Sequence, residues 1–142
     1  MGSEQEKVAL EFLRGAEGRQ QDVDHLVGLM SADVVWQPNV PTSLPIVGRD
    51  ASRAELERQN SMASGLLSGS EIRSVASNDR QVFVERVDVF EMGGKPITLH
   101  ITGVIDVEGG KVSGWREYWD NADLAQQLGI DVASLVGRPE GA

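Results

Sequence analysis

The chain has 142 residues, a formal net charge of −9 and no cysteine. This length is sufficient for one domain with a buried core. The lack of cysteine excludes disulfides, iron–sulfur clusters and thiol catalysis, and the two histidines, His25 and His100, lack the spacing of metal ligands. We therefore expect no metal and no cofactor. The negative charge, with basic residues scattered singly, indicates that nucleic acid is not a partner.

The chain shows no sign of a membrane or export segment. No apolar stretch approaches the ~20 residues that a membrane helix requires, and the first residues do not form a secretory signal. We therefore expect a cytoplasmic protein with no membrane partner. The pattern of elements predicts a single domain over residues 1–142, with its core over about 7–128 and a flexible tail over about 137–142.

The first half of the chain predicts helices with one short strand among them. Three helices are expected: residues 3 to about 17, a second opened by Asp22 or Asp24, and a third from Asp50 to about residue 64. Residues 34–37 form a short strand, and the proline-rich segment 39–48 must be irregular. The Gly/Ser-rich stretch 64–70 is expected to be a turn.

From residue 71 onward the pattern changes to consecutive strands. They are expected at 71–76, 81–92, 97–107 and 111–120, before a short helix at 123–128. The pairs Gly93-Gly94 and Gly109-Gly110 are typical of tight hairpin turns. Helices followed by an antiparallel meander predict an α+β fold, with helices packed on one face of a strongly curved sheet. Such a sheet forms a cone whose interior is a natural pocket.

The strand at 81–92 carries two charges on its apolar face. Side chains two residues apart on a strand project to the same side. Arg86 and Asp88 therefore share a face with Val82, Val84 and Phe90. Because buried charges are costly unless they pair or take part in chemistry, this strand predicts either a structural ion pair or a functional site.

The strand at 111–120 places a carboxylate between two indoles. Trp115, Glu117 and Trp119 share one face, and Val112 is expected on the other. A carboxylate between indoles loses hydration, which raises its pKa unless a cation compensates. Glu117 is therefore a second candidate for acid–base chemistry.

Arg86 can bridge Asp88 and Glu117 if the two strands lie in one sheet. A proton donor and a proton acceptor would then lie together in a dry pocket. Leu99 and Ile101 are expected to join the apolar lining of this pocket, whereas His100 falls on the opposite face, at an interface or on the surface. The alternative is that the arginine and the aspartate only satisfy each other as a structural pair.

These residues resemble the limonene-1,2-epoxide hydrolase family, within the SnoaL-like, NTF2-like (cystatin-like) superfamily of α+β cones. The resemblance covers about residues 7–128. Three stretches carry it: Trp36-Gln37-Pro38-Asn39 through Ala51, Glu85-Arg86-Val87-Asp88-Val89, and Gly110 through Trp115-Arg116-Glu117-Tyr118-Trp119-Asp120. It implies a curved mixed or antiparallel sheet with N-terminal helices that enclose an apolar pocket.

That family opens an epoxide with water in one step, without a covalent intermediate or a cofactor. The resemblance implies that Asp88 is the acid, Glu117 the base that deprotonates water, Arg86 the bridge between them, and Asn39 an amide that holds the water. We expect a small lipophilic substrate and a homodimer formed through the outer face of the sheet. The residues expected to bind the substrate are Trp36, Val84, Phe90, Leu99, Ile101, Trp115 and Trp119.

The chain departs from the family pattern at two positions, and these leave alternatives open. Glu117 stands where the family has aspartate, and Trp36 stands where it has a water-binding tyrosine; an indole donates one hydrogen bond and accepts none. If water is poorly held, a hydroxyl of the substrate can attack instead and close a cyclic ether, as in related cyclases of polyketide maturation. A third interpretation is a non-catalytic protein that binds an apolar ligand, with Arg86 holding a carboxylate of that ligand.

Overall fold

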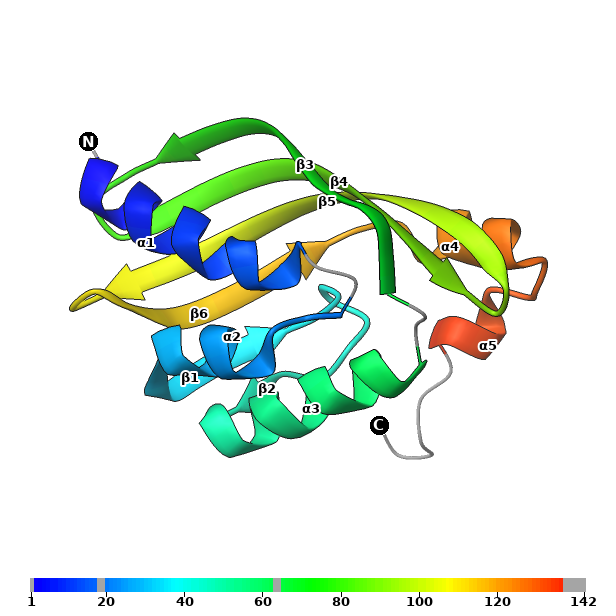
Figure 1. The fold of residues 1–142 in the computed structure, drawn as a ribbon, viewed down its shortest axis with the longest axis horizontal. Coiled ribbons are helices and arrows are strands. Elements are labelled where there is room, and N and C mark those ends of the chain that lie inside the picture. The colour runs from blue at the N-terminus through cyan, green and yellow to red at the C-terminus, as the bar shows by residue number, and fades with distance from the viewer. Residues whose placement is uncertain (1, 18–19, 63–64, 137–142) are drawn as a thin grey trace.

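A computed structural model describes residues 2–17, 20–62 and 65–136 of the chain. Within them, six strands form one sheet in the order β2-β1-β6-β5-β4-β3 (Figure 1). The strands are β1 (Met30–Gln37), β2 (Ile46–Val47), β3 (Gly65–Ser77), β4 (Gln81–Met92), β5 (Lys95–Glu108) and β6 (Lys111–Tyr118). The helices are α1 (Ser3–Leu13), the 3₁₀ helix η1 (Arg14–Ala16), α2 (Val23–Leu29), α3 (Arg49–Met62), α4 (Asn121–Leu128) and α5 (Ala133–Val136). The sheet is mixed, because β1 runs parallel to β6 and the other neighbours are antiparallel.

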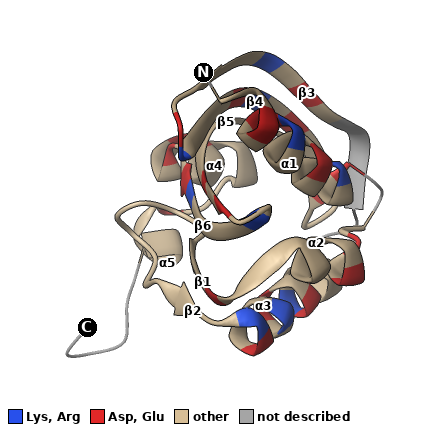
Figure 2. Ribbon diagram, turned by 90° about the vertical axis from the view of Figure 1, so that its left-hand side faces the viewer, with Lys and Arg blue, Asp and Glu red and all other residues tan. Residues whose placement is uncertain are grey.

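The sheet is strongly curved, and helices cover its concave side. Figure 2 shows the strands bending around α1, while α2 and α3 lie across the open side of the curve. The helices α4 and α5 lie at one end of the sheet (Figure 1). Phe12 of α1, Trp36 of β1 and Trp115 of β6 are among the largest buried side chains, so the main core lies between the sheet and the N-terminal helices. The predicted α+β fold with a curved sheet is confirmed.

Local interactions explain where several elements begin and turn. The Asp22 carboxylate accepts a hydrogen bond from the backbone N–H of His25 (3.1 Å) and caps α2. Asp120 caps α4 in the same way, by accepting from the N–H of Ala122 (2.9 Å). The hairpins β4–β5 and β5–β6 turn at the two predicted glycine pairs, whose φ angles lie between 57° and 77°. Backbone of this kind matches the twist of the flanking strands.

The predicted turn over residues 64–70 is wrong from residue 65 onward. Strand β3 begins at Gly65 and pairs with β4, from Gly65 opposite Glu91 to Ser77 opposite Val82. Glycine and serine have low intrinsic strand propensity, but hydrogen bonding to the long neighbouring strand overrides that preference. Residue 64 and the predicted tail at 137–142 lie outside the described residues.

The alternation expected in β6 is broken near its start. The pairing of β5 with β6 shifts register between Asp106 and Val107. Val112 is paired with Val107, and both belong to the main core, as does Trp115. The expectation that Val112 faces away from Trp115 is therefore wrong, because a bulge inserts an extra residue between them.

The helices carry their charged residues outward. Figure 2 shows acidic and basic residues interspersed along α1 and α3. One ion pair, from Arg53 to Asp24 (2.9 Å), joins α3 to α2. Of the helices in the described part of the chain, none has the length and apolar character to cross a membrane.

The outer face of the sheet exposes large apolar side chains. Val35, Phe83 and Tyr118 are each about 40% exposed and alternate with side chains that point inward. His100 also lies on this face, as predicted, opposite Val87 in the pairing of β4 with β5. A homodimer through this face stays a prediction.

Candidate active site

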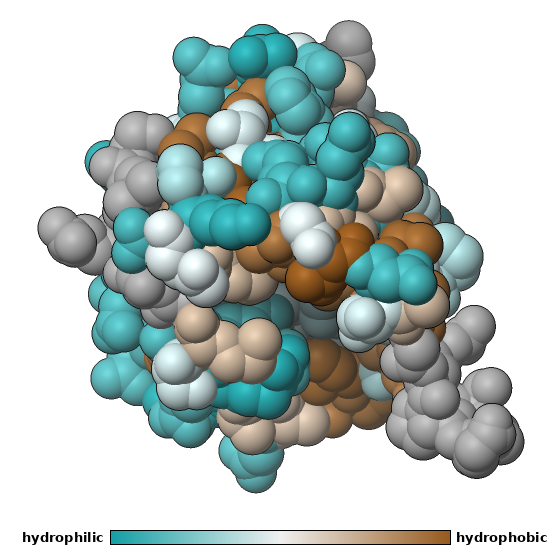
Figure 3. All heavy atoms as spheres, turned by 90° about the vertical axis from the view of Figure 1, so that its right-hand side faces the viewer, coloured by the Kyte–Doolittle hydropathy of each residue, from teal (hydrophilic) through white to brown (hydrophobic). Residues whose placement is uncertain are grey.

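A cavity of about 280 Å³ lies in the concave side of the sheet and is bordered across from it by α3 and the segment before α2. The cavity is lined toward α4 by apolar side chains: Phe90, Met92, Leu99, Ile101, Trp119 and Leu124. Figure 3 shows hydrophobic residues gathered around a hollow on this side of the molecule. Four ionisable side chains also line the cavity: Arg86, Asp88 and Glu117 from the sheet, and Arg58 from α3.

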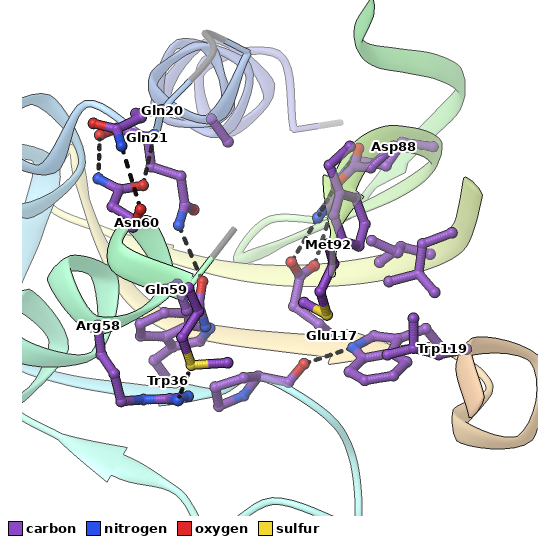
Figure 4. A pocket seen from close by; sticks show the side chains of 18 of the residues that line it. Gln20, Gln21, Trp36, Arg58, Gln59, Asn60, Asp88, Met92, Glu117 and Trp119 are labelled. Atoms are coloured by element: carbon purple, nitrogen blue, oxygen red, sulfur yellow. Dashed lines mark hydrogen bonds and ion pairs between the residues drawn. The ribbon is translucent and has the colours of Figure 1, made fainter. Parts of the chain in front are cut away.

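Arg86 joins the two carboxylates. Its Nη1 and Nη2 donate to Glu117 Oε2 (2.8 Å) and Oε1 (2.6 Å), as a bidentate pair. Its Nε and Nη2 donate to Asp88 Oδ1 (3.2 Å) and Oδ2 (3.4 Å), which are longer contacts. The predicted bridge from Asp88 through Arg86 to Glu117 is present in the structure (Figure 4 labels both carboxylates).

The bridge is almost removed from solvent. The side chains of Arg86, Asp88 and Glu117 are 4%, 14% and 9% exposed. Burial by itself would lower the pKa of Arg86, but the charges and hydrogen-bonding of Glu117 and Asp88 outweigh burial and raise this pKa above its ordinary value. The arginine therefore stays charged and supplies the compensating cation between the two carboxylates.

Arg86 reaches Glu117 across an intervening strand. The sheet order places β5 between β4 and β6, so the two residues are not on adjacent strands. Gly103 of β5 is paired with Glu117 and with Val84. Because glycine has no side chain, the space above it is open for the ion pair.

Ser70 of β3 forms a hydrogen bond with Asp88 from the strand on the far side of β4 from β5. It is paired with Asp88 in the sheet, and its Oγ donates to Asp88 Oδ1 (2.6 Å). The sequence did not indicate this residue, because it lies in the stretch expected to be a turn. A hydroxyl can both donate and accept a hydrogen bond, so this contact can persist when Asp88 gains or loses a proton.

The aromatic wall of the cavity is rigidly packed. Trp36 stacks on Trp115, with ring centroids 4.7 Å apart and planes 10° apart, and Phe12 meets Trp115 edge to face. The Nε1 atoms of Trp36 and Trp115 are buried and have no hydrogen-bond partner among the described residues. Both indoles therefore act as apolar surface in this arrangement.

Asn39 does not lie where a water-holding amide was expected. It is not among the described residues that line the cavity. Its Nδ2 donates to the backbone oxygen of Trp119 (3.1 Å), and its Oδ1 accepts from Asn121 (2.7 Å). Pro38 lines the cavity in its place, with its backbone oxygen bound by Trp119 Nε1 (2.8 Å). The amide instead ties the segment after β1 to the residues that follow β6.

Residues 4–129 match the family model described as the limonene-1,2-epoxide hydrolase catalytic domain. The chain belongs to the limonene-1,2-epoxide hydrolase family. This confirms the resemblance drawn from the three sequence stretches and supports an epoxide-related function at the level of the family.

Solved structures show the same fold. An LEH-like epoxide hydrolase of M. tuberculosis is 24% identical, with a TM-score of 0.75 over 96% of this chain and 98% of that chain. SalBIII, an epoxide hydrolase/cyclase-like enzyme with a role in pyran ring formation in the polyether salinomycin, is 17% identical, with a TM-score of 0.71 over 87% and 97%. A protein of Catenulispora acidiphila with a ketosteroid isomerase-like fold is 14% identical, with a TM-score of 0.76 over 89% and 95%.

For this member of the limonene-1,2-epoxide hydrolase family, the structure brings most predicted site residues to one cavity. These are Trp36, Arg86, Asp88, Phe90, Leu99, Ile101, Trp115, Glu117 and Trp119. Val84 is the other exception besides Asn39, since it is fully buried in the main core rather than in the lining. The alternation that placed Val84 inward was correct, but it could not distinguish packing against α1 from contact with the cavity.

No pattern in the sequence indicated a group of amides that also line this cavity. Gln20 and Gln21 precede α2, and Gln59 and Asn60 belong to the last turns of α3. Figure 4 shows them across the cavity from Asp88 and Glu117. Among the described residues, no group of three or more His, Asp or Glu side chains is arranged to hold a metal ion.

Proposed function

We propose that this protein opens a lipophilic epoxide with water by concerted acid–base catalysis. Asp88 donates a proton to the epoxide oxygen, Glu117 removes a proton from the attacking water, and Arg86 holds both carboxylates. The observation that carries the proposal is the buried arginine joined to two carboxylates inside a largely apolar cavity. The apolar lining favours a small lipophilic substrate.

The unequal contacts of Arg86 support this division of roles. Its bonds to Glu117 are 2.6 and 2.8 Å long, whereas those to Asp88 are 3.2 and 3.4 Å long. Short bidentate bonds from a guanidinium favour a carboxylate in its charged form, as a base requires. Asp88 is held more loosely by the cation, and the Ser70 hydroxyl can accept a hydrogen bond from it when it carries a proton.

The reaction balances without a cofactor. The water oxygen forms a bond to one epoxide carbon while the bond from that carbon to the epoxide oxygen breaks. The Asp88 proton goes to the released oxygen, and the water proton goes to Glu117, so the product is a vicinal diol. The return of one proton from Glu117 to Asp88 then restores the starting state for the next turnover.

A second candidate function, cyclisation, is favoured by the aromatic wall. Trp36 replaces the family's water-binding tyrosine, and Asn39 is turned away from the cavity. A substrate hydroxyl that reaches the epoxide carbon would need no water site, because the folded substrate supplies the nucleophile. The same acid and base would then form a cyclic ether.

Product analysis in ¹⁸O-labelled water separates these functions. We would incubate the protein with lipophilic epoxides, some of which carry an internal hydroxyl, and identify the products by mass spectrometry. A diol with one labelled oxygen, absent with Asp88→Asn, supports hydrolysis. An unlabelled cyclic ether supports cyclisation. Full activity of Asp88→Asn or Glu117→Gln would defeat both mechanisms, and the lack of any turnover would favour a binding protein.

A further inference from the structure

The wall opposite the carboxylates is polar, although the rest of the cavity is largely apolar. Four amide side chains meet there, two from the segment before α2 and two from α3. Asn60 is fully engaged with the backbone of Gln21: its Oδ1 accepts from the Gln21 N–H (3.0 Å), and its Nδ2 donates to the Gln21 oxygen (2.9 Å). These bonds fix the position of Gln21, whose side chain points along the cavity toward Gln59 (Figure 4).

A chain of hydrogen bonds sets the direction of the Gln21 amide. Arg58 Nε and Nη2 donate to the Glu55 carboxylate (2.8 and 2.5 Å), and this pairing holds the pKa of Glu55 below its ordinary value. An ionised carboxylate only accepts hydrogen bonds. Gln59 must therefore turn its Nε2 toward Glu55 Oε2 (3.1 Å) and its Oε1 toward Gln21.

The same reasoning decides how the side-chain amide of Gln21 is oriented. Gln21 meets the oxygen of Gln59, so it must donate its own Nε2 (3.0 Å). Its Oε1 is then left as a hydrogen-bond acceptor, and no donor among the described residues reaches it. A half-buried acceptor at the wall of a cavity favours a ligand that brings a donor.

We propose that Gln21 Oε1 accepts a hydrogen bond from a hydroxyl group of the substrate, so that the substrate is a lipophilic epoxide hydroxylated at the end remote from the epoxide. The proposal rests on the proposed function for the position of the reacting end. A hydroxyl held by Gln21 lies across the cavity from Asp88 and Glu117 (Figure 4). It therefore orients the substrate and is not the nucleophile.

The test measures binding without turnover. In the Asp88→Asn background, calorimetry would compare terminal epoxides that carry a hydroxyl at the other end of the chain with their methyl ethers, from hexane to decane chains. The ether keeps the acceptor and the carbon chain but lacks the donor. At the best chain length, we expect the hydroxy epoxide to bind about three- to tenfold more tightly, the effect of one hydrogen bond.

Gln21→Met, added to Asp88→Asn, should abolish that preference, because methionine has a similar length and no strong acceptor. Gln126→Met, on the exposed side of α4, is the matched control and should keep it. Thermal melts would confirm that each variant is folded. A preference that survives Gln21→Met, or no preference at any chain length, overturns the inference. Failure of the wild type to open these epoxides would count against the proposed function and leave the binding result standing.

Discussion

Gly103 lies beside Glu117 in adjacent strands, and its missing side chain leaves the space into which the Glu117 carboxylate turns. A Cβ atom added at Gly103 would lie 2.7 Å from Glu117 Oε2 and 3.3 Å from Arg86 Nη1. Both distances are shorter than an ordinary van der Waals contact. The bridge between the carboxylates therefore depends on a residue that makes no polar contact with them.

Gly103→Ala should lower both the catalytic rate and the unfolding free energy, because it adds a methyl group beside Glu117. The methyl group would push the Glu117 carboxylate away from Arg86. A displacement of about 1 Å in a catalytic group can lower the rate by about a hundredfold, and overpacking costs about 1–3 kcal/mol of unfolding free energy. Steady-state kinetics on the epoxide found active with the wild type, together with urea unfolding, would measure both effects.

Gly28→Ala is the matched control, because a Cβ added at Gly28 would meet no atom within 4 Å. It should keep full activity and leave stability unchanged or raised, since alanine favours a helix more than glycine does. An unaffected rate in Gly103→Ala would show that the pairing of Arg86 with Glu117 is not required for turnover.

Arg86→Met should unfold more easily than any exposed arginine variant. Removal of the cation leaves Asp88 and Glu117 buried beside each other without compensation, which costs about 3–5 kcal/mol. Arg53→Met is the control, because its partner Asp24 is exposed and such a pair contributes at most about 1 kcal/mol. Equal losses of unfolding free energy in the two variants, measured in urea at pH 7, would contradict the buried bridge.

Alternation along the strands predicted most of the cavity lining and the bridge from Asp88 through Arg86 to Glu117, but not the neighbours that support this bridge. Arg86 and Asp88 share a face because of the two-residue period, and this was visible in the sequence. The contacts of Gly103 and Ser70 depend on how four strands are aligned, and irregularities in β3 and β6 shift that alignment by one or two residues. The position of Asn39 depends on the irregular segment after β1, for which no periodic pattern exists.

Ser70→Ala tests whether the hydroxyl positions the proposed acid. The change removes the 2.6 Å hydrogen bond to Asp88 Oδ1 and leaves the bonds from Arg86. We expect a lower kcat and a little-changed KM, because the change affects how the acid is held and not how the substrate binds. Ser70→Thr keeps the hydroxyl and should restore most of kcat. If alanine and threonine both give the kcat of the wild type, the hydrogen bond has no part in catalysis.

Low pH should reduce the stability of the fold through Asp106, which lies on the outer face of the sheet. Arg116 donates to its carboxylate (2.6 and 3.0 Å) and holds the pKa of Asp106 below its ordinary value of 3.8. A pKa that is lower in the folded state adds stability above the unfolded value, and this stability is lost as the pH falls through the folded value. Asp106→Asn should therefore cost up to about 1 kcal/mol at pH 7. In urea titrations, the difference in unfolding free energy between Asp106→Asn and the wild type should shrink below pH 3.8. A difference that stays constant with pH would exclude the charge of Asp106 as the cause of the lost stability.

If the wild type closes a cyclic ether from a hydroxy epoxide, Trp36→Tyr should shift the product toward the diol. Trp36 lies in the cavity wall, and its Nε1 makes no hydrogen bond within the described part of the chain. A tyrosine hydroxyl can both donate to and accept from a water molecule, which the indole cannot do. Trp36→Phe is the matched control, since it opens similar space beside Trp115 without adding a hydroxyl. With a hydroxy epoxide in ¹⁸O-labelled water, the fraction of labelled diol should rise in the tyrosine variant and not in the phenylalanine variant. An equal rise in both would mean that space at this wall, rather than a group that holds water, decides which nucleophile attacks.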